Sequence, residues 1–275
     1  MAKFCVILPA AGKSSRFGDL HYKKPFAPIN NRAVWIHTAQ HFLNRKDVTQ
    51  VILVVSPEDY DDVRTKYRGE ISVNGITVVR GGKERADSIE NAISAIQPEC
   101  DFVCVHDAAR PCIADDWIQS VFRTAIQTGA AILAAPMTDS IKKVQPTQNT
   151  NKKKKKNTLS LDNLIPETDE KQASDGIITQ SLDRENIWKA QTPQVFRRDW
   201  FEEAYAHRSH DLSVKTTDDS MLIEQLGHSV HIVEGSSLNI KITTKTDLYL
   251  AEAILKILPG RKPNAFHPFR NEEFF

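Results

Sequence analysis

Residues 4–18 read FCVILPAAGKSSRFG, and this stretch decides the fold. Its first part, Phe4–Leu8, is a short continuous apolar run, which is typical of a strand buried on both faces of a parallel sheet. Its second part is a loop of small residues that also carries Lys13 and Arg16. Small residues let the backbone approach a ligand, and the N–H groups of such a loop can bind phosphate. The stretch therefore predicts a first strand followed by a phosphate-binding loop or by an ordinary turn.

Short apolar runs alternate with amphipathic helical segments in the rest of the first half of the chain. The expected strands are Phe4–Leu8, Val51–Val55, Ile76–Val79, Phe102–Val105 and Ala131–Ala135. The expected helices are Val34–Asn44, Pro57–Tyr67, Ala86–Ile96 and Asp115–Thr128. This alternation predicts an α/β fold with a parallel sheet covered by helices on both faces. Ligands of such sheets bind beyond the carboxyl ends of the strands.

The alternation stops after Val144. Residues 146–176 are polar and rich in lysine, and we interpret them as an exposed, disordered insertion. Apolar residues return at Ile177–Leu182, which we expect to pair with Ile141–Val144 as a two-stranded arm. Later elements are expected at Asp199–His207, Asp218–Leu226, Val230–Val233 and Thr246–Leu258. We therefore expect one domain over residues 1–258, with an arm at about 138–190, followed by a tail at 259–275.

Composition narrows the class of protein. The formal net charge is +1, so the chain as a whole has no basic field for nucleic acid, and we expect the lysine run 152–156 to be a solvated surface. No apolar run approaches the roughly 20 residues of a membrane span. The four cysteines form no CxxC pair, which favours buried thiols in a reducing cytoplasm. We therefore expect a cytoplasmic enzyme that binds neither nucleic acid nor membranes.

A second glycine turn, GGKERADS at residues 81–88, leads into a helix. Asp87 or Ser88 is suited to cap that helix. Because the turn also follows the carboxyl end of an expected strand, it is equally suited to contact a base or ribose. Both interpretations remain open from the sequence.

A third motif, VHDAARP at residues 105–111, closes the fourth expected strand. A carboxylate at this place, Asp107, suits a Mg²⁺ ligand or a ribose contact. Alternatively, Asp107 and Arg110 pair with each other. His106 has no His or Cys at metal-ligand spacing, so we expect a structural histidine. Further along, Lys241 lies in an apolar stretch, where a lysine needs an anionic partner unless it points to solvent.

Seven segments in this order resemble the 2-C-methyl-D-erythritol 4-phosphate cytidylyltransferase family of the non-mevalonate isoprenoid pathway. They are PAAGKSSRF (9–17), GGKERADSI (81–89), VHDAARP (105–111), AAPMTDSIKKV (134–144), LDRENIWKAQTPQ (182–194), TDDS (217–220) and EGSSLNIKIT (234–243). The resemblance covers residues 4 to about 258, apart from the insertion. It implies a Rossmann-like sheet, a protruding β-arm exchanged across a homodimer, and Mg²⁺-dependent transfer of CMP from CTP to methylerythritol phosphate with release of pyrophosphate.

The resemblance also implies a set of site residues. Arg16, Lys24 and Lys241 would surround the phosphates in the catalytic step. The nucleotide side would comprise Pro9, Ala10, Ala11, Gly12, Lys13, Gly82, Asp87, Ser88 and Ala108. The polyol phosphate side would comprise Asp107, Arg110, Ser140, Arg184, Thr192 and Thr217, with Arg184 from the partner subunit and Asp107 also binding the metal. Thr217 is equally suited to cap the helix expected at Asp218–Leu226.

The sequence departs from the family pattern at three places. Ser14 stands where a second glycine is common, which is tolerable provided that the backbone there avoids positive φ. Lys23-Lys24-Pro25 replaces the usual Pro-Lys-Gln, and we assign Lys24 to the triphosphate by register. Ser140 replaces the usual threonine and keeps its hydroxyl.

Two alternatives remain beside this function. A cytidylyltransferase for ribitol phosphate or another polyol phosphate would share the same CTP-binding half. A catalytically silent nucleotide-binding protein would be expected to lack Lys24, Asp107 or Lys241, and all three are present. A kinase is not favoured, because neither a Walker A motif nor the kinase motifs occur.

Overall fold

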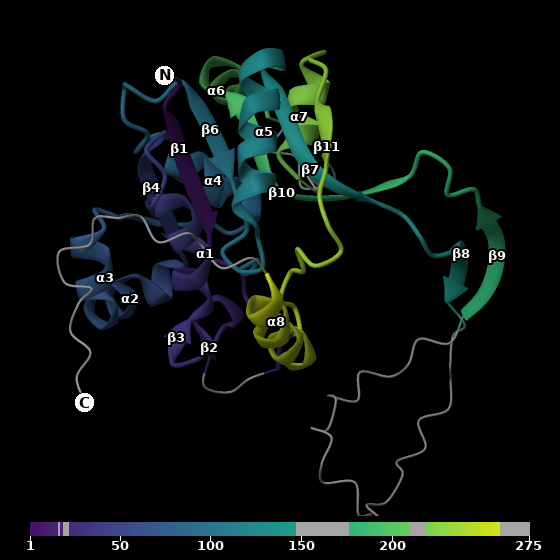
Figure 1. Ribbon diagram of the computed structural model, residues 1–275, viewed down its shortest axis with the longest axis horizontal. Coiled ribbons are helices and arrows are strands. Elements are labelled where there is room, and N and C mark those ends of the chain that lie inside the picture. Colours follow the sequence, from purple (N-terminus) through teal and green to yellow (C-terminus); the bar gives the residue numbers. More distant parts are fainter. Residues whose placement is uncertain (16, 19–21, 147–175, 209–217, 259–275) are drawn as a thin grey trace, which may run out of the picture. The chain divides into compact units, whose positions relative to one another are not determined.

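The computed structural model describes residues 1–15, 17–18, 22–146, 176–208 and 218–258 (Figure 1). It divides into two compact units, residues 136–189 and the remainder of the chain. The predictions made for Arg16, Thr217, the tail 259–275 and nearly all of the insertion concern residues outside the described ranges.

The larger unit is built on a seven-stranded sheet in the order β11-β7-β10-β6-β1-β4-β5. Its strands are β1 (Phe4–Pro9), β4 (Val48–Val55), β5 (Thr77–Arg80), β6 (Phe102–Val105), β7 (Ala130–Pro136), β10 (Trp188–Arg197) and β11 (His231–Glu234). Strands β5, β4, β1 and β6 run parallel to one another, and β7 runs parallel to β11. Strand β10 is antiparallel to β6. The predicted mostly parallel α/β sheet is confirmed.

Helices cover both faces of this sheet, because the side chains of β1 point alternately to the two faces and those of Phe4–Leu8 are all buried. Phe4, Val6 and Leu8 pack into the core beneath α1 (Val34–Leu43), α2 (Tyr60–Lys66) and α5 (Asp115–Thr128). On the opposite face, Cys5 and Ile7 pack into the core with α4 (Arg85–Ile93), α6 (Arg198–Ala206) and α7 (Ser220–Gln225). Because both faces are buried, β1 and β6 are apolar throughout, and this is why their sequence signal is strong.

The last helix, α8 (Lys245–Ile257), belongs to a third, smaller core next to the main one. Its start is fixed by reciprocal hydrogen bonds. Asp247 N donates to Thr244 Oγ1 (3.3 Å), and Thr244 N donates to Asp247 Oδ2 (2.8 Å). Ile242 and Ile254 are buried in this core beside Ile29. Packing of α8 thereby positions the segment that precedes it, which carries Lys241.

Short elements complete the larger unit. They are η1 (Lys24–Phe26), β2 (Pro28–Ile29), β3 (Arg32–Ala33), η2 (Pro57–Asp59) and α3 (Arg68–Val73). The strands β2 and β3 form a small antiparallel pair of their own. In the described part of the chain, the longest helices are too short or too polar to cross a bilayer.

The smaller unit contains an antiparallel hairpin of β8 (Ile141–Pro146) and β9 (Gly176–Leu182) (Figure 1). Ile141 pairs with Leu182, which confirms the predicted two-stranded pairing. The hairpin exposes large apolar side chains, with Ile177 66% exposed and Ile178 58% exposed.

One strand of the large sheet, β10, was not predicted. Its buried centre contains Gln191, Thr192, Pro193 and Gln194. Three polar residues and a proline in a row do not predict a buried strand. The three polar side chains can be buried because each of them is hydrogen-bonded. Gln191 bonds to Ser236, Thr192 to His106 and Gln194 to Asp218.

Candidate active site

A cleft of about 980 Å³ lies at the carboxyl ends of β1, β4, β5 and β6, where the fold class predicts a ligand. Residues at or just beyond the ends of these strands line it, among them Pro9, Ser56, Gly81 and Asp107. The remaining lining residues come mainly from the two glycine turns and from the basic segment near residue 24. They are Ala10, Ala11, Gly12, Lys13, Lys23, Lys24, Pro25, Pro57, Glu58, Gly82, Lys83, Glu84, Arg85, Ser88, Ala109 and Lys241.

The first glycine loop is held by backbone and hydroxyl contacts. Ala10 N donates to Val54 O at 2.7 Å, which joins the loop to the neighbouring strand. Ser14 has φ of 53°, so the backbone adopts the left-handed conformation that the sequence analysis had required it to avoid. Its hydroxyl accepts a hydrogen bond from Lys24 N at 3.1 Å. This bond offsets the cost of positive φ and ties the loop to the segment carrying Lys24.

Lys23, the neighbour of Lys24, has a carboxylate partner. Lys23 Nζ is 2.5 Å from Asp59 Oδ2 and 3.1 Å from Ser56 Oγ. Its charge is thus neutralised by a carboxylate at the start of α2. Both Lys23 and Lys24 line the cleft, and the assignment of Lys24 to the triphosphate stays a prediction.

The second glycine turn lies against the first. A Cβ at Gly81 would come within 2.7 Å of Ala11 Cβ, so only glycine fits there. Gly82 N donates to Ser88 Oγ at 3.1 Å, and the same hydroxyl donates to Glu84 O at 3.0 Å. Ser88 therefore fixes the turn as well as lining the cleft.

Asp87 takes the capping role that was one of its two interpretations. Its Oδ2 accepts from Glu84 N at 3.0 Å at the start of α4. Its Oδ1 accepts from Arg208 Nη2 at 2.7 Å.

Asp107 is a carboxylate surrounded by positively charged side chains in the cleft. Its Oδ2 lies 2.9 Å from Lys241 Nζ and 3.1 Å from Arg110 Nε. Burial by itself raises the pKa of Asp107, but the charges of Lys241, Arg110 and Arg85 outweigh it and hold the pKa well below its ordinary value. Lys241 thus has the anionic partner that its apolar surroundings require.

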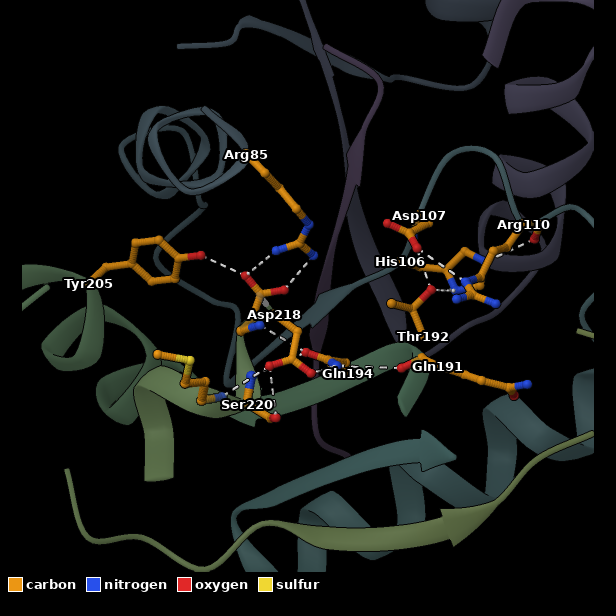
Figure 2. Close-up of polar contacts among 12 residues, drawn as sticks. Arg85, His106, Asp107, Arg110, Gln191, Thr192, Gln194, Tyr205, Asp218 and Ser220 are labelled. Atoms are coloured by element: carbon orange, nitrogen blue, oxygen red, sulfur yellow. Dashed lines mark hydrogen bonds and ion pairs between the residues drawn. The ribbon is translucent and has the colours of Figure 1, made fainter. Parts of the chain in front are cut away.

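A buried polar network supports Asp107 from below (Figure 2). Asp107 N donates to Thr192 Oγ1 at 3.0 Å, and the same oxygen lies 3.1 Å from His106 Nδ1. His106 Nε2 lies 3.0 Å from Arg110 O. Burial lowers the pKa of His106 to about 3, so the ring is neutral and uses one nitrogen as donor and the other as acceptor. This confirms the expectation of a structural histidine.

Comparison with known proteins identifies the family. Residues 4–161 and 153–257 match the family model described as IspD, 2-C-methyl-D-erythritol 4-phosphate cytidylyltransferase. A protein of that name from Alkaliphilus oremlandii is 35% identical over 260 residues, which cover 93% of this chain and 96% of the relative. The chain belongs to the 2-C-methyl-D-erythritol 4-phosphate cytidylyltransferase family. As a member of that family, it is a CTP-dependent nucleotidyltransferase.

Other relatives extend the match. The chloroplastic cytidylyltransferase of Oryza sativa subsp. japonica is 32% identical, over 91% of this chain and 73% of the relative. The crystal structure of the Francisella tularensis cytidylyltransferase superposes with a TM-score of 0.68 at 28% identity, covering 92% of this chain and all of that one. The Rossmann-like fold expected from the resemblance is therefore confirmed.

The structure places the expected cytidylyltransferase site residues in several groups. Those lining the cleft are Pro9, Ala10, Ala11, Gly12, Lys13, Lys24, Gly82, Ser88, Asp107 and Lys241. Around the cleft, within the same unit, are Asp87, Ala108, Arg110 and Thr192. Ala108 is fully buried and its carbonyl accepts from Thr38 Oγ1 at 2.9 Å, while Thr192 is 5% exposed. In the smaller unit, Ser140 is exposed before β8, and Arg184 donates to Thr138 O.

One buried carboxylate, Asp107, is available in the cleft to a divalent cation. Among the described residues, no three His, Cys, Asp or Glu side chains cluster as a metal cage. Asp107 is a single buried carboxylate facing a cleft lined with lysines. Mg²⁺ is commonly held by one or two carboxylates together with substrate phosphates and water, so Asp107 fits a cation that arrives with the nucleotide.

Sequence reasoning missed one pair of residues at this site. Arg85, which is labelled in Figure 2, lines the cleft, and both of its terminal nitrogens donate to Asp219, at 3.0 and 2.6 Å. In the sequence, Asp219 stands out only as part of the TDDS segment. No local pattern could have joined the two residues, because they lie in separate motifs far apart in the chain.

Proposed function

We propose that this cleft binds CTP and that it performs the reaction of the family, transfer of CMP to the phosphate of 2-C-methyl-D-erythritol 4-phosphate with release of pyrophosphate. The observation that carries the proposal is the convergence of two glycine turns, Lys24, Lys241 and Asp107 on one cleft. The turns supply close backbone approach and N–H donors for the nucleotide. The lysines supply positive charge for the phosphates.

The chemistry requires positioning and charge more than acid–base catalysis. A substrate phosphate oxygen is already nucleophilic, so no general base has to generate it. The difficulty lies in bringing two polyanions together and in stabilising negative charge at the α-phosphorus. Lys24 and Lys241 reach the cleft from different segments and are placed to do this, and Arg16 is assigned to the same task from the resemblance.

We assign the divalent cation to Asp107 together with the phosphates of bound CTP. The cation, when bound, would supply further positive charge at the phosphates. Asp107 stays ionised, because Lys241 and Arg110 hold its pKa well below the ordinary value. Thr192, which fixes the backbone at Asp107, keeps the carboxylate in place.

The polyol phosphate is assigned to Arg110, Ser140, Arg184, Thr192 and Thr217, with Arg184 supplied by the arm of a second subunit. The exposed apolar side chains of the β8–β9 hairpin, such as Ile177 and Ile178, support a role of this arm in homodimer contact.

Subunit mixing tests the exchanged arm. Arg184→Ala and Lys241→Ala proteins would each be inactive alone, while a mixed dimer contains one intact site. Mixing should then restore about a quarter of the wild-type activity. A monomer by light scattering, or no recovery on mixing, would contradict the exchange.

Pyrophosphate release tests the function as a whole. Purified protein with Mg²⁺ is assayed with each of the four nucleoside triphosphates, and with either methylerythritol phosphate or ribitol phosphate. Release only with CTP and methylerythritol phosphate is the expected result. Release with ribitol phosphate alone would retain the nucleotide site and reject the acceptor. CTP binding without release in any combination would indicate a catalytically silent binding protein.

A further inference from the structure

The ion pair between Arg85 and Asp219 joins two parts of the site that are far apart in sequence. Arg85 is the first residue of α4, directly after the second glycine turn, and its side chain is 28% exposed at the cleft. Asp219 precedes α7 and its side chain is fully buried. Both carboxylate oxygens accept from the guanidinium, the bidentate geometry that fixes orientation as well as distance.

Asp219 is in turn fixed from its other sides. The hydroxyl of Tyr205 donates to Asp219 Oδ1 at 2.6 Å. Burial and the charge of Asp219 raise the pKa of Tyr205 well above its ordinary value, so the hydroxyl remains a donor. The backbone N–H of Asp219 donates to Gln194 Oε1 at 3.1 Å. A buried carboxylate with these partners has one position available to it.

Gln194 continues the network to the acceptor side of the site. It lies on β10, two residues after Thr192, and Thr192 accepts the hydrogen bond from Asp107 N. The contacts therefore run from the nucleotide turn through Arg85, Asp219 and Gln194 to the strand that supports Asp107. Figure 2 labels Arg85, Gln194 and Asp107 along this path.

We infer that Arg85 and Asp219 are positioning residues that hold the nucleotide-binding turn at a fixed distance from the acceptor-binding strand. The inference rests on the proposed function, since it concerns the alignment of that function's two substrates. The pair acts on alignment rather than on affinity for the nucleotide alone. Its loss is expected to lower kcat while CTP binding is retained.

The variants are Arg85→Gln, Asp219→Asn and the double variant, each close in size to the residue it replaces. Each single variant should lower kcat at least tenfold, with the Kd for CTP, measured by calorimetry without acceptor, within threefold of wild type. The double variant should be no more than threefold slower than the slower single variant, because both changes break the same link. The matched control is the exposed pair Arg80 and Asp61, 3.6 Å apart, changed to Gln and Asn with no expected effect.

A second readout does not depend on turnover. Amide hydrogen exchange should become faster in both residues 81–84 and residues 190–195 in each single variant, and in neither region in the control. If Asp219→Asn fails to fold, the kinetic and hydrogen-exchange measurements are made on Arg85→Lys instead. This variant keeps the charge but not the bidentate contact.

Three results would overturn the inference. A tenfold weaker Kd for CTP at unchanged kcat would make Arg85 a direct nucleotide contact. Additive losses in the double variant would mean that the residues act separately. A lower Tm with unchanged kcat and unchanged exchange in the two segments would leave the pair a stabilising contact only. Wild-type protein that releases no pyrophosphate would instead reject the proposed function, and the exchange measurement would still decide the link.

Discussion

Lys241 Nζ lies 2.9 Å from Asp107 Oδ2 inside the cleft, although Asp107 follows β6 and Lys241 lies in the segment before α8. The pair forms only when β6 and the segment before α8 meet. It keeps Asp107 ionised and holds the lysine at the place where the α-phosphate of a bound nucleotide is proposed to lie. The electrostatics of the site thus depend on the docking of α8.

Removing either lysine that faces the cleft should abolish most of the activity. Lys24→Ala and Lys241→Ala are each expected to lower kcat/KM by at least about 100-fold, or about 3 kcal/mol, by analogy with the loss of one oxyanion-hole donor. Steady-state kinetics of pyrophosphate release measure this. Lys256→Ala, at a residue 68% exposed on α8, is the control and should match wild type. Wild-type rates in either variant would remove that lysine from the mechanism.

Gly82→Ala should damage nucleotide binding. An added Cβ would come within 2.4 Å of Asp87 Cβ, at the start of α4, so the turn must shift away from Asp87. We expect KM for CTP to rise at least tenfold, with a smaller change in kcat. Gly69→Ala is the matched control, because nothing lies within 4 Å of its added Cβ. An unchanged KM for CTP would show that the turn does not contact the nucleotide.

Ser14 offers a test of the left-handed loop. Ser14→Gly relieves positive φ, worth about 1 kcal/mol, but loses the hydrogen bond to Lys24 N, also worth about 1 kcal/mol, so its stability should stay near wild type. Ser14→Ala keeps the strain and loses the bond, and should unfold about 1 kcal/mol more easily. Urea denaturation compares the two. Equal stability of the Gly and Ala variants would mean that positive φ costs nothing here.

The sequence was most informative where burial on both faces makes a strand wholly apolar. Phe102–Val105 and Asp115–Thr128 were predicted with the observed bounds, as β6 and α5. The cleft was also foreseeable, because glycine turns at the carboxyl ends of parallel strands must converge. Strand β10 was not foreseeable, since its polar residues are stable in the sheet only through partners elsewhere in the chain.

The same limit applies to side-chain contacts. A motif shows that Arg85 and Asp87 are neighbours at a helix start, but not that one faces Asp219 and the other Arg208. Which partner each side chain contacts depends on the packing of α6 and α7 against α4. For Ser14, the sequence identified the position at which strain had to be considered, and only the backbone conformation answered it.

His106 makes stability depend on pH in a definite direction. Burial lowers the pKa of His106 from 6.5 to about 3, so the folded protein does not protonate the ring between these values while the unfolded chain does. The unfolded state therefore binds one more proton, and the free energy of unfolding falls as the pH drops below about 6.5. One such group contributes a slope of about 1.4 kcal/mol per pH unit below that value.

Urea denaturation of wild type and His106→Gln between pH 5 and 8 measures this contribution. The variant should be less stable at pH 8, because the contacts with Thr192 and Arg110 are weakened, but its stability should fall less steeply toward pH 5. The difference between the two proteins should therefore shrink as the pH falls. His231→Gln, at an exposed position on β11, should keep the wild-type slope. If the free energies of unfolding of wild type and His106→Gln change with pH in parallel, the ring is protonated in the folded protein. The conclusion that a neutral His106 supports Asp107 would then be wrong.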